Sequence, residues 1–188
     1  SHGGGFSPKY REFWYPGWSG TTVYRHDLSY QQVGSFVSGT GDMMQLWGDI
    51  DGTYYTANWG NDRVRKFQDK SASQIWEYNL GTTAGGICSD GTYAYAMRSS
   101  GSTVWKLNKD NGQLVETFDL PNIPNSLSGG LVCTPGRLYY GRSDGSVRIY
   151  DLSTKTEVGS FNVGSGISNM SFDGQVMYTS PNSSTVTR

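Results

Sequence analysis

The sequence predicts an all-β fold, a β-propeller whose four-stranded antiparallel blades each take about 40 residues. The main observation is a valine that follows a short polar turn five times, at Val23, Val64, Val104, Val147 and Val186, with spacings of 41, 40, 43 and 39 residues. The composition agrees, because 14% of the residues are aromatic, only 16% are charged and 26 are glycine. Such a composition is typical of short strands joined by tight turns.

The second repeat shows the four predicted strands most clearly. They span residues 44–47, 54–59, 63–67 and 74–78, and the turns between the first three contain Asp51-Gly52 and Gly60-Asn61-Asp62. Turns rich in Asp, Asn and Gly between alternating apolar runs are the strongest short-range signal for a hairpin. Each repeat is therefore expected to form one antiparallel meander.

The same order of strands recurs along the chain, which predicts a single domain over residues 1–188. The predicted blades are 6–38, 43–79, 85–120, 129–163 and 168–188. Residues 6–10 are the candidate innermost strand of the first blade, although Pro8 argues against a regular strand there. The fifth repeat ends inside its third strand, just after Val186, so four complete repeats and a partial fifth are expected.

Repeated residues are expected to be core. Gly85-Gly86 and Gly129-Gly130 precede an innermost strand, where backbones must approach closely. An aromatic residue ends the fourth strand of each complete repeat, and we expect this set to fill space between elements: Phe36, Tyr78, Phe118 and Phe161.

The two cysteines are predicted to be free thiols. Cys88 and Cys133 each stand three residues before a turn glycine, which places them at the same position in neighbouring repeats. Equivalent sites in adjacent blades are expected to be too far apart for a disulfide, whose Cα atoms lie within about 7 Å of each other. Buried thiols would leave the redox compartment open.

Three repeats resemble known propeller families. Residues 51–58 and 61–67 are similar to an NHL repeat, with its Asp-Gly turn, YVAD-like strand and Asn-x-Arg-Val motif, and Asn58 stands where that family usually has Asp. Residues 103–108 with 111–113, and 136–140 with 143–152, resemble quinoprotein-type or WD-type blades. Because these families share a fold but range from scaffolds and RNA binders to lyases, the resemblance implies architecture more than activity.

Enzymatic chemistry has little support in the sequence. The only histidines are His2 and His26, neither beside a plausible nucleophile. Asp49 is the one candidate ligand at the inner end of a blade, and its predicted equivalents Cys88, Cys133 and Ser171 cannot complete a metal ring. Asp49-x-Asp51-Gly52 resembles the start of a calcium loop but lacks the later carboxylates, so we interpret it as a hairpin turn. No catalytic residue, metal or cofactor is expected.

Unrepeated polar and aromatic residues on one rim are the better functional candidates. Loops between the second and third strands, and between blades, emerge on the same face, and they carry Trp18, Asn58, Trp59, Asn61, Asp62, Arg98 and Asp144. An indole beside amide and carboxylate groups suits a peptide or a sugar. Trp18 and Trp59 are equivalent by alignment, so packing is the competing interpretation.

The leading hypothesis is a non-enzymatic module for protein–protein interaction or extracellular structural assembly. The alternatives are a lectin-like glycan binder that uses rim aromatics, and an NHL-like metal-dependent lyase or hydrolase whose ligands come from further chain. The formal net charge of −1 argues against a nucleic-acid partner, and no apolar run is long enough to span a membrane.

Several expectations about context accompany this hypothesis. The low charge and the abundance of Tyr, Gly and Ser favour an extracellular, secreted protein, in which the sequons at Asn169 and Asn182 would be N-glycosylation sites. The ending inside a strand favours a fragment of a longer propeller over a closed five-bladed ring. A ring completed by another subunit, for example in a homo-oligomer, is the third option.

Overall fold

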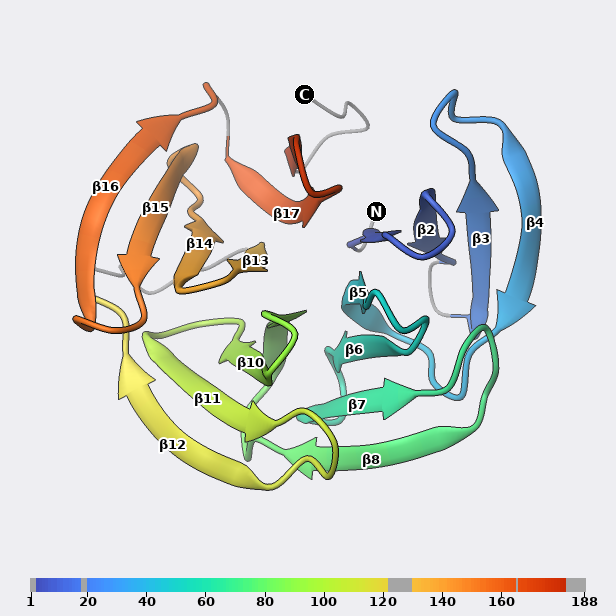
Figure 1. Cartoon of the computed structure of the whole chain (residues 1–188), viewed down its shortest axis with the longest axis horizontal. Helices are drawn as coiled ribbons and strands as arrows, with labels where there is room; N and C mark the ends of the chain where they lie inside the picture. Colours follow the sequence, from blue (N-terminus) through green and yellow to red (C-terminus); the bar gives the residue numbers. More distant parts are fainter. Residues whose placement is uncertain (1–2, 18–19, 122–129, 165, 182–188) are drawn as a thin grey trace.

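The computed structural model describes residues 3–17, 20–121, 130–164 and 166–181. Within these ranges the secondary structure consists of strands and turns, with no helix. Five antiparallel sheets are arranged radially around a central axis (Figure 1), which is the predicted β-propeller.

Eighteen strands build the blades, and each complete blade has its first strand innermost and its fourth outermost (Figure 1). The first blade contains β1 (Gly5–Ser7), β2 (Glu12–Pro16), β3 (Thr22–His26) and β4 (Gln32–Val37). The second contains β5 (Met43–Gly48), β6 (Tyr54–Asn58), β7 (Arg63–Phe67) and β8 (Gln74–Asn79). The third contains β9 (Ala84–Ser89), β10 (Tyr93–Arg98), β11 (Thr103–Asn108) and β12 (Leu114–Asp119). The fourth contains β13 (Leu131–Thr134), β14 (Arg137–Gly141), β15 (Ser146–Asp151) and β16 (Thr156–Asn162), and the fifth contains β17 (Ile167–Phe172) and β18 (Met177–Pro181).

The repeated valines are core residues of the third strands. Val23, Val64, Val104 and Val147 are all fully buried. Each lies opposite the aromatic residue next to the end of the neighbouring fourth strand, as in the pair Val23 and Phe36. Val186 lies outside the described residues.

The innermost strands form a closed circuit around the axis. β1, β5, β9, β13 and β17 contact one another in that order, and β17 in turn contacts β1. Where the fifth blade meets the first, Asn169 Nδ2 donates a hydrogen bond of 2.7 Å to the carbonyl oxygen of Gly4. Where the first blade meets the second, Gly3 N donates to Met44 O at 2.8 Å. The innermost strand of the first blade, β1, ends just before Pro8. It pairs with β2, and the chain turns at Pro8.

Glycines allow this close approach, as predicted. A Cβ on Gly85 would lie 2.5 Å from the Cα of Ser99, and one on Gly130 would lie 2.6 Å from Cγ of Met170. Gly85 thus permits close backbone contact with Ser99, just after the neighbouring strand β10 of the same blade, and Gly130 permits close contact with Met170 of the fifth blade.

The prediction of two free thiols is wrong, because Cys88 and Cys133 form a disulfide that joins β9 to β13. Their Cα atoms are 5.5 Å apart, inside the usual range for a disulfide. The distance expected between neighbouring innermost strands was too long, since these strands converge at the axis.

The alignment of the two cysteines was also wrong by one residue. Cys88 lies opposite Tyr95, which pairs with Lys106, two residues after Val104. Cys133 lies opposite Leu138, which pairs with Tyr150, three residues after Val147. Because side chains alternate between the two faces of a strand, this shift makes Cys88 face the fourth blade and Cys133 face the third blade. The two thiols therefore face each other across the gap between the blades.

A β-bulge recurs at the same place in the fourth strand of every complete blade. The ladder between the third and fourth strands skips one residue, which is Val33, Ile75, Val115 or Val158 in successive blades. All four side chains are between 41% and 51% exposed. Bulges of this kind twist an outer strand and interrupt its unpaired edge, which disfavours edge-to-edge association.

The aromatic residues that end the fourth strands pack against the following blade. Phe36 lies edge-on to Tyr54 of the second blade at 5.4 Å, and Phe118 stacks on Tyr150 of the fourth at 5.5 Å. Phe161 departs from the pattern and is 42% exposed. The reason is that the next blade contributes only β17 and β18 within the described part of the chain.

A mostly buried ion pair stabilises the first blade. Glu12 accepts hydrogen bonds from Arg25 at 2.8 and 2.6 Å, and from the Trp14 indole at 3.0 Å. Burial alone would raise the pKa of Glu12, but the hydrogen bonds from Arg25 and Trp14 outweigh it and lower the pKa. The pair thus contributes stability that is present above the ordinary pKa of a glutamate and is lost as the pH falls through the lowered value.

Replacing Glu12 by Gln is expected to lower the free energy of unfolding at pH 7 by about 2 kcal/mol, because Arg25 loses its charged partner. The difference between variant and wild type should shrink as the pH falls below the ordinary pKa of a glutamate, because the stability contributed by the ion pair is lost toward the lowered pKa of Glu12. Urea unfolding across this pH range measures both effects, with Asp110→Asn on an exposed turn as the control. An equal loss at pH 3 and pH 7 would show that the ion pair is not the source.

Candidate functional site

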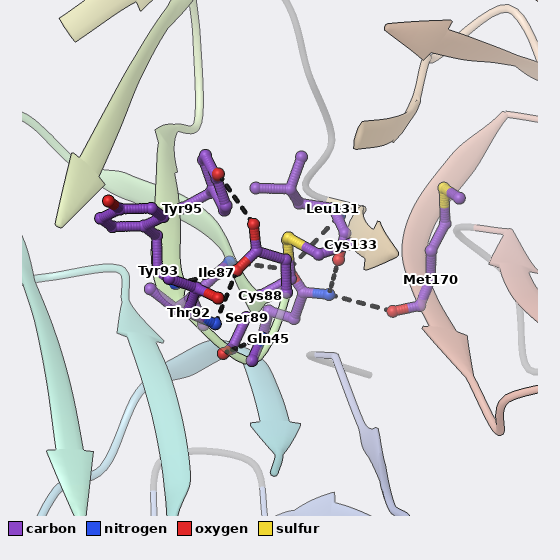
Figure 2. The surroundings of a disulfide bond; sticks show 12 residues. Gln45, Ile87, Cys88, Ser89, Thr92, Tyr93, Tyr95, Leu131, Cys133 and Met170 are labelled. Atoms are coloured by element: carbon purple, nitrogen blue, oxygen red, sulfur yellow. Dashed lines mark hydrogen bonds between the residues drawn. A yellow bond between two sulfur atoms is a disulfide. The ribbon is translucent and has the colours of Figure 1, made fainter. Parts of the chain in front are cut away.

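The axis of the propeller is closed by one buried amide, the side chain of Gln45 on β5. Its Nε2 donates to the carbonyl oxygens of Leu131 at 2.8 Å and Met170 at 3.0 Å, and its Oε1 accepts from Ile87 N at 2.9 Å and Leu131 N at 3.4 Å. Figure 2 shows this side chain reaching from its own blade to three others, beside the Cys88–Cys133 disulfide. The amide is saturated with protein partners, so the axis at this level is a structural junction and not a ligand channel.

The acidic turn at Asp49 is an inter-blade contact. Lys109 Nζ lies 3.1 Å from Asp49 and 3.5 Å from Asp51, and the Lys109 carbonyl accepts a hydrogen bond from Trp76 Nε1 at 2.9 Å. Burial opposes the charge of Lys109, but the hydrogen bond and charge of Asp49 prevail and raise its pKa. Both carboxylates thus face a cation of the third blade, which fits the interpretation of this segment as a hairpin turn.

The described residues contain no group of three or more His, Cys, Asp or Glu side chains that could hold a metal ion. His26 packs edge-on against Tyr15, with ring centroids 5.2 Å apart, at the end of β3. His2 is outside the described ranges. Over the part of the chain that the structure covers, no helix has the length and apolarity to cross a membrane.

Trp59 is the most prominent of the predicted rim residues. It follows β6 in the loop to β7, its backbone N–H donates to Asp42 O at 2.9 Å, and its side chain is 53% exposed. Asn61 in the same loop is also exposed. Asp62 adopts a positive φ of 56° and accepts a hydrogen bond from Leu80 N at 2.8 Å through its carbonyl. The structure therefore presents an exposed indole on a loop that is fixed by backbone hydrogen bonds on both sides.

Asn58 has a structural position, in contrast to Trp59. It is fully buried, and its Nδ2 donates to Thr40 Oγ1 at 2.9 Å and to Gly41 O at 2.6 Å. Its Oδ1 accepts a hydrogen bond of 3.1 Å from Arg65, which is also paired with Glu77. This network fastens the connection between the first two blades beneath the Trp59 loop.

The remaining predicted rim residues lie on other blades. Arg98 ends β10 and is partly buried, and it has no carboxylate partner among the described residues. Asp144 accepts two hydrogen bonds from Ser146 within its own turn, which lower its pKa. Within the described part of the chain, neither Arg98 nor Asp144 makes a hydrogen bond or ion pair with the Trp59 loop. Trp18 lies outside the described ranges.

One of the two sequon asparagines, Asn169, lies within the described residues. Asn169 is only 8% exposed, and its side-chain nitrogen is engaged with the Gly4 carbonyl. Asn182 is outside the described residues. The buried hydrogen bond gives Asn169 a role in joining the fifth blade to the first.

A pocket between the first and fifth blades was not anticipated from the sequence. Phe13, Tyr15, Tyr30 and Tyr178 line it, together with Asn169. No pattern in the sequence indicated it, because the two blades that form the pocket lie at opposite ends of the sequence.

Comparisons with known proteins agree with this architecture. No protein-family model matches the chain, and no curated protein matches it. Among solved structures it is similar to the crystal structure of the WD40 β-propeller domain of Doa1, with a TM-score of 0.65 and 12% sequence identity. The match covers 94% of this chain and 60% of that one, so this chain spans less than two thirds of the length of that structure. At this identity the similarity establishes the fold alone.

Proposed function

We propose that this propeller is a non-enzymatic interaction module that binds a protein partner through the rim around Trp59. The observation that carries the proposal is the half-exposed indole of Trp59 on a loop held by hydrogen bonds to Asp42 and from Leu80. Tryptophan is one of the residues most enriched among the energetic hot spots of protein interfaces. The WD40-type fold adds general support, because such propellers present loops on a rigid ring.

The Cys88–Cys133 disulfide supports the further proposal that the protein works in an oxidising, extracellular setting. We likewise propose a role in structural assembly and a ring shared with another subunit. The NHL-like and quinoprotein-like character of individual blades is also a proposal. Glycan binding by the rim is the second candidate function, since an exposed indole beside Asn61 also suits a sugar ring.

Replacing Trp59 by Ala is expected to weaken peptide binding by about thirtyfold, the loss typical of a hot-spot tryptophan. Peptides selected against the wild-type protein from a displayed random library provide the ligands, and titration of each variant provides the dissociation constants. The matched control is Ile50→Ala, because Ile50 is 68% exposed and lies in the turn at the opposite end of β6.

Equal affinity of the selected peptides for Trp59→Ala and the wild type would contradict the proposed site. A glycan array run in parallel with both variants separates the two candidate functions. Glycan binding that is lost in Trp59→Ala, with no peptide selected, would favour the lectin-like alternative.

A further inference from the structure

One arginine on the rim has no partner of its own. Arg98 ends β10 and begins the loop to β11, which leaves the third blade on the same rim as the Trp59 loop of the second blade. Its Nε is buried and has no acceptor among the described residues. Its Nη1 and Nη2 likewise make no hydrogen bond or ion pair within that part of the chain, but they are not buried. A partly buried guanidinium without an acceptor is unfavourable, so a group that supplies acceptors from outside would be bound with a gain in free energy.

The guanidinium of Arg98 is held against the backbone of its own loop. A Cβ on Gly101 would lie 2.7 Å from Nε and 2.9 Å from Cζ of Arg98, so the guanidinium packs directly on this glycine. Gly101 also has a positive φ of 113°, which disfavours any other residue there. The stem and Nε of Arg98 are therefore fixed while its terminal nitrogens face solvent, which lowers the cost of ordering the side chain on binding.

The fourth blade has an arginine at the equivalent position, and that arginine has a partner. Arg142, like Arg98, follows the residue that lies opposite the repeated valine of its blade. Its Nη2 lies 3.6 Å from the carboxylate of Asp144 in the same loop. The loop of the third blade, residues 99–102, contains only serine and glycine and offers no carboxylate. A charged partner for Arg98 must therefore come from outside this loop.

The connection from the second to the third blade lies between the β6–β7 loop, which carries Trp59, and the β10–β11 loop. At one end of this connection Leu80 N donates to Asp62 O at 2.8 Å, and at the other end Ser99 N donates to Thr83 O at 2.8 Å. Three residue steps span at most about 10 Å, so the two loops lie within about 20 Å of each other once both hydrogen-bonded contacts are added. An extended peptide of about six residues covers this span, and one peptide can therefore contact both loops.

The charges on the rim favour a carboxylate at Arg98. No other Lys or Arg lies in the β10–β11 loop or in the connection from the second blade. A single guanidinium matches one carboxylate through two parallel hydrogen bonds, whereas a phosphate carries nearly two charges and usually binds to a cluster of arginines. Asp42 and Asp62 flank the Trp59 loop and would repel an anion placed at the indole. An acidic group of a partner is therefore better accommodated at Arg98 than at Trp59.

We propose that Arg98 is the carboxylate-binding anchor of this rim. The partner is then an acidic peptide segment whose carboxylate accepts hydrogen bonds from Nη1 and Nη2 of Arg98 while an apolar side chain packs on Trp59. The carboxylate can belong to an Asp or Glu side chain or to the C-terminus of the peptide. This inference rests on the interaction proposed for the Trp59 rim and specifies the chemistry of the partner.

Peptides selected on the wild-type protein from a displayed random library provide the probes. Each is synthesised in three forms: unchanged, with Asp and Glu replaced by Asn and Gln, and with its C-terminus amidated. We expect the tightest peptides to contain a carboxylate whose neutralisation weakens binding by about tenfold. Loss on replacement of Asp and Glu indicates an acidic side chain, and loss on amidation indicates the C-terminus.

Variants of the protein locate the carboxylate. Arg98→Gln should weaken the unchanged peptide by about tenfold and leave the neutralised form unaffected, because only the charged pair is lost. Arg98→Lys keeps the charge but cannot form two parallel hydrogen bonds, so it should recover only part of the affinity. Arg11→Gln is the matched control, because Arg11 is exposed in the turn between β1 and β2, at the opposite end of the blades. Equal binding of the neutralised peptide to Arg98→Gln and the wild type also shows that the variant is folded.

The outcomes separate this proposal from the function proposed for Trp59. Peptides that lose affinity for Trp59→Ala but bind equally to Arg98→Gln and the wild type would overturn the role of Arg98 and leave the Trp59 site standing. Peptides whose carboxylate depends on Arg98 but not on Trp59 would support Arg98 and contradict the Trp59 site.

Three further results would overturn the proposal for Arg98. One is a set of selected peptides that contains no carboxylate needed for binding. The second is a phosphoserine peptide that binds more than tenfold tighter than its glutamate form, which would assign Arg98 to a phosphate. The third is a failure to select any peptide on the wild-type protein.

Discussion

Replacement of both Cys88 and Cys133 by Ala is expected to lower the free energy of unfolding by about 3 to 4 kcal/mol. The disulfide closes a loop with a sequence separation of 45 residues, and the chain-entropy model assigns about 4 kcal/mol to a loop of that length. It also joins the third and fourth blades at the axis, where each blade must dock on its neighbour. Urea-induced unfolding of the variant and the oxidised wild type measures the difference.

Reduction provides the control for this substitution. Dithiothreitol should shift the urea midpoint of the wild type toward that of the Cys88→Ala/Cys133→Ala variant and leave the variant unchanged. A wild-type midpoint that is insensitive to dithiothreitol under fully reducing conditions, with both thiols shown to be alkylated, would contradict a stabilising role for the bond.

Replacement of Gln45 by Ala should be as costly, at about 4 kcal/mol of unfolding free energy. The side chain makes four hydrogen bonds to backbone groups of three other blades, and all of these groups are buried. Its removal leaves donors and acceptors of Ile87, Leu131 and Met170 without partners and opens a cavity at the axis. Chemical denaturation followed by tryptophan fluorescence measures the loss.

Gln32→Ala is the matched control for Gln45, since Gln32 is exposed on the outer strand β4. It should change stability by less than about 0.5 kcal/mol. A similarly small effect of Gln45→Ala would mean that the axis is held by backbone packing alone, and the assignment of Gln45 as the junction would then be wrong.

The blade pattern could be predicted from the sequence because its signals are local. Turn residues such as Asp51-Gly52 and the alternation around Val64 report strand positions within a few residues of themselves. The same turn and strand pattern occurs in each repeat, so each repeat predicts the same strands. The structure has the predicted third strands, with their valines buried in all four complete blades. The same logic marked Gly85 and Gly130 as positions of close backbone approach, which the structure confirms.

The cysteines show where local reasoning failed. Aligning them on their turn glycines assumed that the turns of the third and fourth blades have equal length, but the ladder continues from Ser89 to Ala94 in one and from Thr134 to Arg137 in the other. That difference shifts Cys133 by one position relative to Cys88. One residue reverses the face of a strand, so an error that is small in sequence is decisive for a disulfide.

The candidate sites divide along the same line. Trp59, whose role as a rim residue stays a prediction, is exposed in the loop that follows β6, whereas its neighbour Asn58 is the last residue of β6, a strand in which every residue is buried. The aromatic pocket escaped prediction altogether, since it brings Phe13 and Tyr30 of the first blade against Tyr178 of the fifth.

The sequence by itself determined the repeat, the strand order within each blade and the valine core of the third strands, because these depend on short-range turn chemistry and on periodic apolar residues. Only the tertiary structure decided the Cys88–Cys133 pairing, the junction at Gln45 and the pocket beside Asn169. Each of these joins groups from different blades, separated by 42 to 165 residues along the chain. Their meeting depends on how the blades face one another around the axis, and a repeat that looks alike in every blade carries no information about that orientation.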